Sequence, residues 1–227
     1  MGIRCLARAP SLPIATLEER LAALGAVPMP ESARWWRQCI YQLPRQAEMG
    51  LHELFVLHSS EGTDGEKLIV HRARAAQQGG AAGSAVRVLR AGSEITAVLT
   101  AMQTHNQRLK VELQGSAHAC GDFVVRIGQL FINQGSLAGV AVEIEYLPCA
   151  LASAAATNAP LHAFLDLVLP PALKERDFAS SSVECFRDAC DLPRAFGPEH
   201  CALLFVGLMR EKLLSGGAPA SSGSANR

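Results

Sequence analysis

The 227-residue sequence predicts an α+β fold, a curved antiparallel sheet closed or nearly closed into a β-barrel and flanked by helices. Three observations predict it. Strand-like runs separated by turn residues recur through the first two thirds of the chain, without a helix between each pair as a parallel sheet would require. Two helical patterns are inserted among the strands, and one or two more occupy the last third. Barrels of this length commonly form one domain.

The first half of the chain contains one helix among its strands. Ile14, Leu17, Leu21 and Leu24 repeat at three- and four-residue steps, which is typical of an amphipathic helix, and Gly25 follows as its C-terminal glycine. Strands are expected at Gly2–Ala7, Arg34–Leu43, Leu51–Ser59 and Lys67–Arg72. The last two form a hairpin whose turn is Gly62–Gly65.

Alanine, glycine, glutamine and serine dominate residues 73–85, which predicts a flexible loop. The sheet resumes at Val86–Arg90. Ser93 is expected to cap a helix that runs to about Asn106, and its apolar face comprises Ile95, Val98, Leu99 and Met102.

Apolar residues at Leu109, Val111 and Leu113 alternate with polar residues, which is the clearest strand pattern in the chain. A long hairpin is expected over Asp122–Asn133 and Leu137–Pro148, turning near Gly135.

Two helices are expected in the last third, Leu161–Leu169 and one opening at Pro198, the second apolar on all sides. The Gly/Ser/Ala-rich residues 215–227 predict a disordered tail. We therefore expect a single domain over residues 1–214, with no function in the loop or the tail.

Composition excludes several classes of function. The formal net charge is +0, so no basic field is present to attract nucleic acid directly. No apolar run reaches the length of about 18 residues that a membrane-spanning helix needs. Seven scattered cysteines without a CxxC pair indicate a reducing intracellular compartment.

The sharpest candidate for chemistry is the pair Glu143 and Glu145. Residues two apart on a strand project to one side, and paired carboxylates inside a barrel are the ligands with which tunnel-type phosphohydrolases hold a divalent metal. Such a tunnel also needs a second carboxylate pair on another strand and inward cations. The neighbouring strand is expected to supply only Glu112, with Lys110 beside it. The simpler interpretation is a glutamate face in water or against a partner, with Val140, Val142, Ile144 and Tyr146 facing the core. On that interpretation, replacing both glutamates by alanine costs within about 0.5 kcal/mol.

Other arrangements of reactive side chains are weaker. The spacing of Cys185, Cys190, His200 and Cys201 does not fit a zinc finger, and Cys149 with His58 or His118 lacks the sequence around a thiol nucleophile. Gly79, Gly80 and Gly83 lack the lysine of a phosphate-binding loop. We expect neither a cofactor nor a small-molecule substrate.

Trp35 and Trp36 are adjacent on a predicted strand, so one indole should enter the core while the other remains outside. An outward tryptophan is a common anchor of protein interfaces. The alternative is that another part of the same chain covers it.

The stretch from Asp122 to Gly128 (DFVVRIG), followed by Val142 to Cys149 (VEIEYLPC), resembles the signature of the subunit-20 family of the Mediator complex. Further landmarks follow in the family's order: the opening MGIRC, LAALGA at 21–26, FVLHSSE at 55–61 and FGP at 196–198. The resemblance covers most of residues 1–214. Its motif positions, Asp122, Phe123, Gly128, Glu143, Glu145, Tyr146, Pro148 and Cys149, are expected to be structural.

This resemblance implies a nuclear, non-catalytic subunit of the Mediator head module. It also implies pairing with subunit 18, support from a helix of subunit 8, contact with other head-module subunits and, through them, with RNA polymerase II. The alternatives are a metal-dependent tunnel-type phosphohydrolase on a similar barrel, or a generic protein-binding barrel unrelated to transcription.

Overall fold

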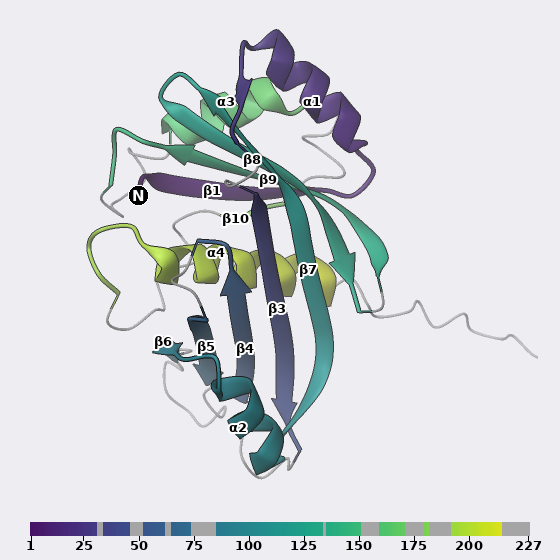
Figure 1. The fold of residues 1–227 in the computed structure, drawn as a ribbon, viewed down its shortest axis with the longest axis vertical. Coiled ribbons are helices and arrows are strands. Elements are labelled where there is room, and N and C mark those ends of the chain that lie inside the picture. Colours follow the sequence, from purple (N-terminus) through teal and green to yellow (C-terminus); the bar gives the residue numbers. More distant parts are fainter. Residues whose placement is uncertain are drawn as a thin grey trace, which may run out of the picture.

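The computed structural model describes residues 1–30, 34–45, 52–61, 65–73, 85–133, 135–150, 159–170, 179–181 and 192–214. Its main element is an antiparallel sheet in the strand order β10-β1-β9-β8-β7-β3-β4-β5-β6, with β2 paired to β7. The strands are β1 (Ile3–Ala9), β2 (Val27–Pro28), β3 (Trp35–Pro44), β4 (His52–Ser59), β5 (Lys67–Ala73), β6 (Ala85–Ala91), β7 (His105–Cys120), β8 (Phe123–Ile132), β9 (Ser136–Tyr146) and β10 (Ala179–Ser181). The sheet curls into a half-barrel (Figure 1).

The predicted α+β class and the curved antiparallel sheet are confirmed, although the barrel is less closed than expected. β6 and β10 are the two ends of the strand order and do not pair with each other. The first predicted helix is α1 (Ile14–Ala23), and Gly25 follows it with φ +77°, the left-handed conformation that glycine adopts most readily.

Helices cover both faces of the curved sheet (Figure 1). α1 contacts β8, and α3 (Ala159–Val168) contacts β9 and β1, so these two helices form one outer layer. α4 (Pro198–Met209) lies on the concave side, where it contacts β1, β5 and β10. α2 (Ile95–Met102) lies at the far end of the sheet, against the outer side of β4 and β5.

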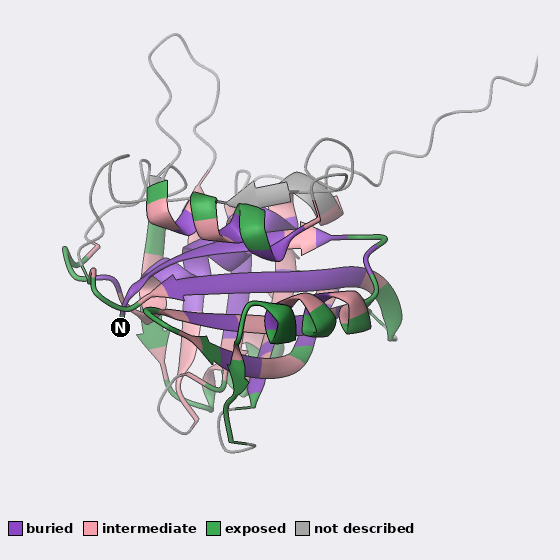
Figure 2. Ribbon diagram, turned by 90° about the horizontal axis from the view of Figure 1, so that it is seen from above, coloured by how far each residue is buried: buried purple, intermediate pink, exposed green. Residues whose placement is uncertain are grey.

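Strands between the two helical layers are buried on both faces. Nearly every residue of β1 is buried, and so is the middle of β9 from Val140 to Glu145. Figure 2 shows β1 as a continuous buried strand through the centre of the molecule. A strand in this position has no solvent face, so polar residues on it must find partners inside the protein.

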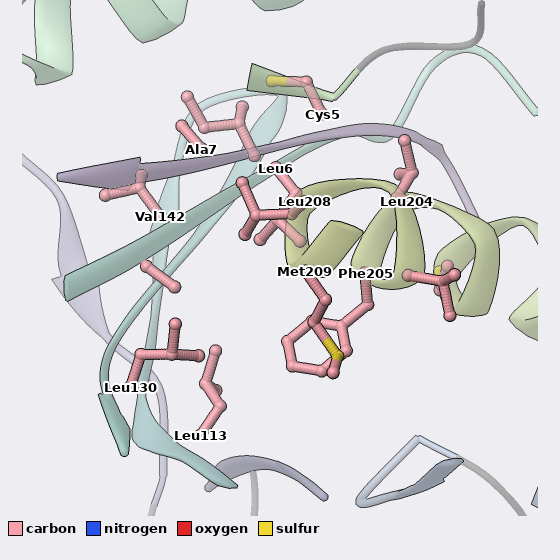
Figure 3. Packing of buried hydrophobic residues seen from close by; sticks show 14 of the residues in the cluster. Cys5, Leu6, Ala7, Leu113, Leu130, Val142, Leu204, Phe205, Leu208 and Met209 are labelled. Atoms are coloured by element: carbon pink, nitrogen blue, oxygen red, sulfur yellow. The ribbon is translucent and has the colours of Figure 1, made fainter. Parts of the chain in front are cut away.

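The concave side is filled by α4. Its side chains are buried on all sides because the helix lies inside the curve of the sheet. In Figure 3, Leu204 and Leu208 extend toward β1, while Phe205 and Met209 extend toward Leu113 and Leu130 of β7 and β8. The predicted all-round apolar helix opening at Pro198 is therefore confirmed.

One predicted helix differs from the structure, and one short strand was not predicted. The helix expected to reach Asn106 ends at Met102, because Gln103 is left-handed (φ 52°) and β7 already begins at His105. Pairing of His105 with Pro44 of β3 overrides the local helical pattern. Ser93 does not cap this helix, whose N-cap is Glu94 without a side-chain bond. The short β10 was not expected, since its register with β1 is a tertiary feature.

Several predictions lie outside the described residues. They include most of the loop at 73–85, the tail at 215–227, and the candidate ligands Cys185 and Cys190.

Candidate functional site

A buried cluster of charges lies on the concave face of the sheet, and we call it the ion cluster. Its six members come from five separate places in the fold and comprise Arg4 on β1, Arg37 on β3, Glu61 after β4, Arg126 on β8, and Glu143 and Glu145 on β9.

Arg4 is the centre of the ion cluster. Its Nη1 lies 2.8 Å from Oε1 of Glu143 and its Nη2 lies 2.9 Å from Oε2 of Glu145. Arg4 also forms an ion pair with Glu61. Arg4 and Glu145 are directly opposite each other on neighbouring strands, so sheet register places them on the same side.

Arg37 extends the ion cluster across the concavity. Its Nη2 lies 2.9 Å from Oε2 of Glu61 and 3.2 Å from Oε2 of Glu143. β3 and β9 are not neighbours, since β8 and β7 lie between them. The Arg37 guanidinium also lies 5.3 Å from the ring centre of Phe205, so it contacts α4 as well.

Arg126 completes the ion cluster from β8. Its Nη2 is 2.8 Å from Oε2 of Glu145, and its Nη1 is 3.3 Å from Oε1 of Glu143. The remaining oxygen of Glu145 accepts a hydrogen bond of 2.8 Å from the Gly2 backbone N–H.

Every carboxylate oxygen of the three glutamates therefore has a donor from within the protein. Burial by itself would raise the pKa of the Glu61 carboxyl, but Arg4, Arg37 and Arg126 outweigh it and lower this pKa to about 2. Three arginines and three glutamates balance in charge. The ion cluster holds strands together, and a metal ion could take these oxygens only by displacing arginines.

The expectation that Glu143 and Glu145 face water or a partner was wrong. Glu143 is 0% exposed and Glu145 is similarly buried. The error came from assuming one covered face, whereas α3 covers one face of β9 and the half-barrel encloses the other. The strands beside β9 are β1 and β8, so Glu112 on β7 is not its neighbour.

Sequence reasoning missed Arg4, Arg37, Glu61 and Arg126. The available signal was a single charge inside each of two otherwise apolar strand runs, Arg4 in GIRCLA and Arg126 in FVVRIG. Isolated charges of this kind need a buried partner of opposite sign. No pattern in the sequence shows which glutamate each arginine meets.

Trp35 and Trp36 point to opposite sides, as predicted. Trp35 is 1% exposed, whereas Trp36 lies half-buried on the outer side, edge-on to His58 with ring centres 4.7 Å apart. Next to Trp36 is an open groove of about 440 Å³. The groove is lined by Arg34, Trp36, Arg37, Gln38, His58, Glu112, Leu113 and Gln114.

The groove is mostly polar outside its two aromatic rings. Gln38 donates a hydrogen bond of 2.9 Å to Glu112, and Lys110 forms an ion pair of 2.8 Å with the same carboxylate. Because these charges offset one another, the Trp36 indole is the main apolar group available to a partner here.

The cysteine and histidine candidates do not form a site in the described residues. His200 accepts a hydrogen bond from the Gly197 backbone N–H at its own helix start, and burial raises the pKa of the Cys201 thiol to about 12. His58 packs on Trp36, and His118 shares a hydrogen bond with Ser116. Across the described ranges, no group of three histidine, cysteine, aspartate or glutamate side chains is arranged to hold a metal ion.

The motif positions lie in structural surroundings. Phe123 stacks on Phe164 of α3 at 4.1 Å and lies near Tyr146. Gly128 faces Gly115 on β7, and a Cβ on Gly115 would lie 2.0 Å from the Ile127 carbonyl oxygen, so the two strands approach too closely for side chains. The Cys149 carbonyl accepts a hydrogen bond from Ile3.

The fold and the ion cluster define a class: an antiparallel half-barrel whose concave side is occupied by its own helix and by paired charges. A family model described as the TATA-binding related factor of subunit 20 of the Mediator complex matches residues 1–184. The chain belongs to this family of Mediator subunits, which are components of a transcription coactivator. α4 lies beyond the matched residues. No curated protein sequence matches the chain.

Solved structures resemble it only distantly. The PH1012 protein of Pyrococcus horikoshii is 14% identical over 81% of this chain and 98% of its own, with a TM-score of 0.44. The Mediator head module of Schizosaccharomyces pombe matches at 17% identity over 72% of this chain and 90% of the other, with a TM-score of 0.39. A putative adenylyl cyclase from Hippeastrum, described as having a dominant triphosphatase activity, matches at 10% identity over 74% and 88%, with a TM-score of 0.43. Likenesses at this level carry no argument about what the chain does.

In the part of the chain that the structure describes, no helix is both long enough and apolar enough to cross a membrane.

Removing one charge from the ion cluster should destabilise the protein strongly. In Glu143→Gln, the guanidinium groups of Arg4 and Arg37 lose a buried counter-charge, so we expect a loss of about 3 kcal/mol or more in unfolding free energy. The control Glu112→Gln breaks a pair at the surface and should cost at most about 1 kcal/mol. Urea denaturation measures both, and equal effects of the two changes would contradict a structural role for the cluster.

The ion cluster also predicts loss of stability in acid. The folded-state pKa of Glu61, about 2, is below its ordinary value of 4.5, so the unfolded chain binds this proton first. The stabilisation is present above about pH 4.5 and is lost as pH falls toward about 2. The unfolding free energy of the wild-type protein should exceed that of Glu61→Gln at about pH 5.5, and this difference should decrease toward about pH 3 in denaturation experiments. A constant difference over that range would disprove the assignment.

Proposed function

We propose that this chain is a non-catalytic subunit of the Mediator head module, with residues 1–214 forming one domain. On this proposal it pairs with subunit 18, is held with it by a helix of subunit 8, and helps to couple regulators to RNA polymerase II during initiation in the nucleus. Membership of the subunit-20 family supports the Mediator role. The particular partners rest on the sequence resemblance.

The observation that carries the proposal is the occupied interior of the half-barrel. α4 fills the concave side, and the ion cluster beside it has no carboxylate oxygen without a donor. An enzyme of the tunnel type needs that interior for its substrate and metal. With the interior occupied, binding must use the outer surface.

The outer surface at Trp36 is the partner contact we propose first. The half-buried indole is held edge-on by His58 and borders an open groove of about 440 Å³. A tryptophan fixed before binding loses little entropy when a partner covers it, which is why such residues dominate interface energies.

The alternative function is a metal-dependent phosphohydrolase. The specific observation in its favour is that Arg4, Arg37 and Arg126 converge inside the half-barrel, as phosphate-binding cations would. The observation against it is that the glutamates expected to bind the metal already pair with these arginines.

Affinity purification of the tagged protein from its own cells tests the proposal. We expect recovery of other Mediator subunits, and co-expression with subunit 18 should raise both solubility and melting temperature because a partner binds only the folded state. Trp36→Ala should weaken the subunit 18 complex about tenfold or more. The control Leu137→Ala removes an exposed apolar side chain at the β8–β9 turn and should leave the complex unchanged. Failure to recover any Mediator subunit at endogenous expression would refute the proposed role.

A phosphatase assay separates the two functions. The purified protein should release no phosphate from nucleoside triphosphates with Mg²⁺ or Mn²⁺, since the acidic side chains are engaged. Mn²⁺-dependent release that disappears in Arg126→Gln, with the fold preserved by circular dichroism, would favour the enzyme instead.

A further inference from the structure

A second outer surface lies at the opposite end of the sheet, on α2. No residue of this helix, ITAVLTAM, is charged, yet none of its side chains is fully buried. Ile95 and Leu99 pack on β4 and β5, while Val98 remains 44% exposed and Met102 59% exposed. An uncharged helix that leaves apolar side chains in water is typical of an interaction surface.

The apolar surface continues onto the last strand of the sheet. Leu89 on β6 is paired in register with Ile69, a residue that α2 covers, and Leu89 is 54% exposed. β6 pairs only with β5 among the described strands, so no further strand covers this flank. We call Leu89, Val98 and Met102 the α2 surface.

Basic and titratable side chains border the α2 surface. Arg87, two residues before Leu89 and therefore on the same side of β6, is exposed and lies opposite His71 of β5. The rings of His71 and His52 on β4 are stacked, with Nε2 of His71 3.1 Å from Nδ1 of His52. His105, three residues beyond the end of α2, completes the row and hydrogen-bonds to Thr104.

Arg87 carries a permanent positive charge here, whereas His71 and His105 gain a charge only as pH falls. The pKa of His71 is lowered by burial first, and then by His52, Arg87 and His105. The pKa of His105 is likewise lowered by burial and then by His52. Lys67 adds a cation at the start of α2, where its Nζ donates to Thr96, and Glu94 is the acid beside it.

We propose that the α2 surface binds an acidic segment of another protein that also carries apolar side chains. Its apolar groups cover Leu89, Val98 and Met102, and its carboxylates lie against Arg87 and the histidine row. This partner fits because its carboxylates can pair with Arg87 and, at lower pH, with the protonated imidazoles of His71 and His105 beside it.

The histidines should make the affinity of this interaction depend on pH. A bound carboxylate favours the protonated imidazoles of His71 and His105, whose pKa values are lowered in the protein without a partner. As pH falls, these imidazoles become cations with which the carboxylates can pair. The affinity should therefore increase as pH falls from about 7.5 to about 6, and decrease with salt. A purely apolar contact would show neither dependence.

The test uses the full chain and a fluorescein-labelled peptide in which aspartate alternates with leucine and phenylalanine. Fluorescence anisotropy should show saturable binding. Peptides with lysine in place of aspartate, or serine in place of leucine and phenylalanine, should bind about tenfold more weakly or worse, a loss of about 1.4 kcal/mol.

Variants locate the binding site. Met102→Ser, Leu89→Ser and Arg87→Glu should each weaken binding about fivefold or more, and His71→Gln should flatten the pH dependence. Matched controls are Leu137→Ser, which replaces an equally exposed apolar residue elsewhere (59%), and Arg194→Glu, which reverses an exposed charge outside both proposed surfaces. Both should bind as the wild-type protein does.

Three outcomes would overturn the proposal: no binding by the wild-type protein, equal binding of the lysine peptide, or equal losses in the control variants. Binding that appears only after deletion of residues 77–83 would show that this chain's own segment occupies the surface, and would overturn it too. None of these results bears on recovery of Mediator subunits, so the proposed function is tested separately.

Discussion

The bridge from Arg37 to Glu143 across the concave face is the interaction on which the rest of the structure depends. It joins β3 to β9, strands separated in the sheet by two others, and so fixes the curvature rather than the pairing of the sheet. Arg4, Arg126 and Glu61 tie β1, β8 and the end of β4 to the same point. Buried ion pairs add little net stability compared with apolar packing, but they are costly to break and specify one arrangement.

The ion cluster and α4 depend on each other. Arg37 lies between the cluster and the Phe205 ring, and α4 excludes water from the carboxylates. Further pairs hold both ends of the helix, from Arg90 to Glu199 at its start and from Arg210 to Glu53 just after its end. The charges of the ion cluster are paired, and side chains of α4 occupy the concave side.

The two proposed outer surfaces, the groove at Trp36 and the α2 surface, differ in chemistry. The groove at Trp36 combines one aromatic anchor with balanced polar groups, whereas the α2 surface combines several apolar side chains with a basic row. Different surfaces favour different partners. A charged border disfavours partners that carry the same charge, whereas a buried aromatic side chain contributes affinity. A subunit with both could contact two neighbours at once.

The sequence by itself determined the α+β class, the approximate positions of most strands and of the helices, and the opposite directions of Trp35 and Trp36. The order of its motifs indicated the family. The class, the elements and the tryptophan directions depend on hydrophobic spacing and on residues adjacent along the chain, which periodicity reports directly. Only the tertiary structure decided that Glu143 and Glu145 are buried, that Arg4 and Arg37 meet them, and that α2 stops at Met102. Each of these depends on an element distant in the sequence. Other layers of the fold cover both faces of β9, and the curvature of the sheet brings β3 close to β9. His105 pairs with β3 and therefore belongs to β7 instead of the helix. A local pattern shows that a charge lies on a strand, but only the packing of the other layers decides whether that charge meets water or another charge.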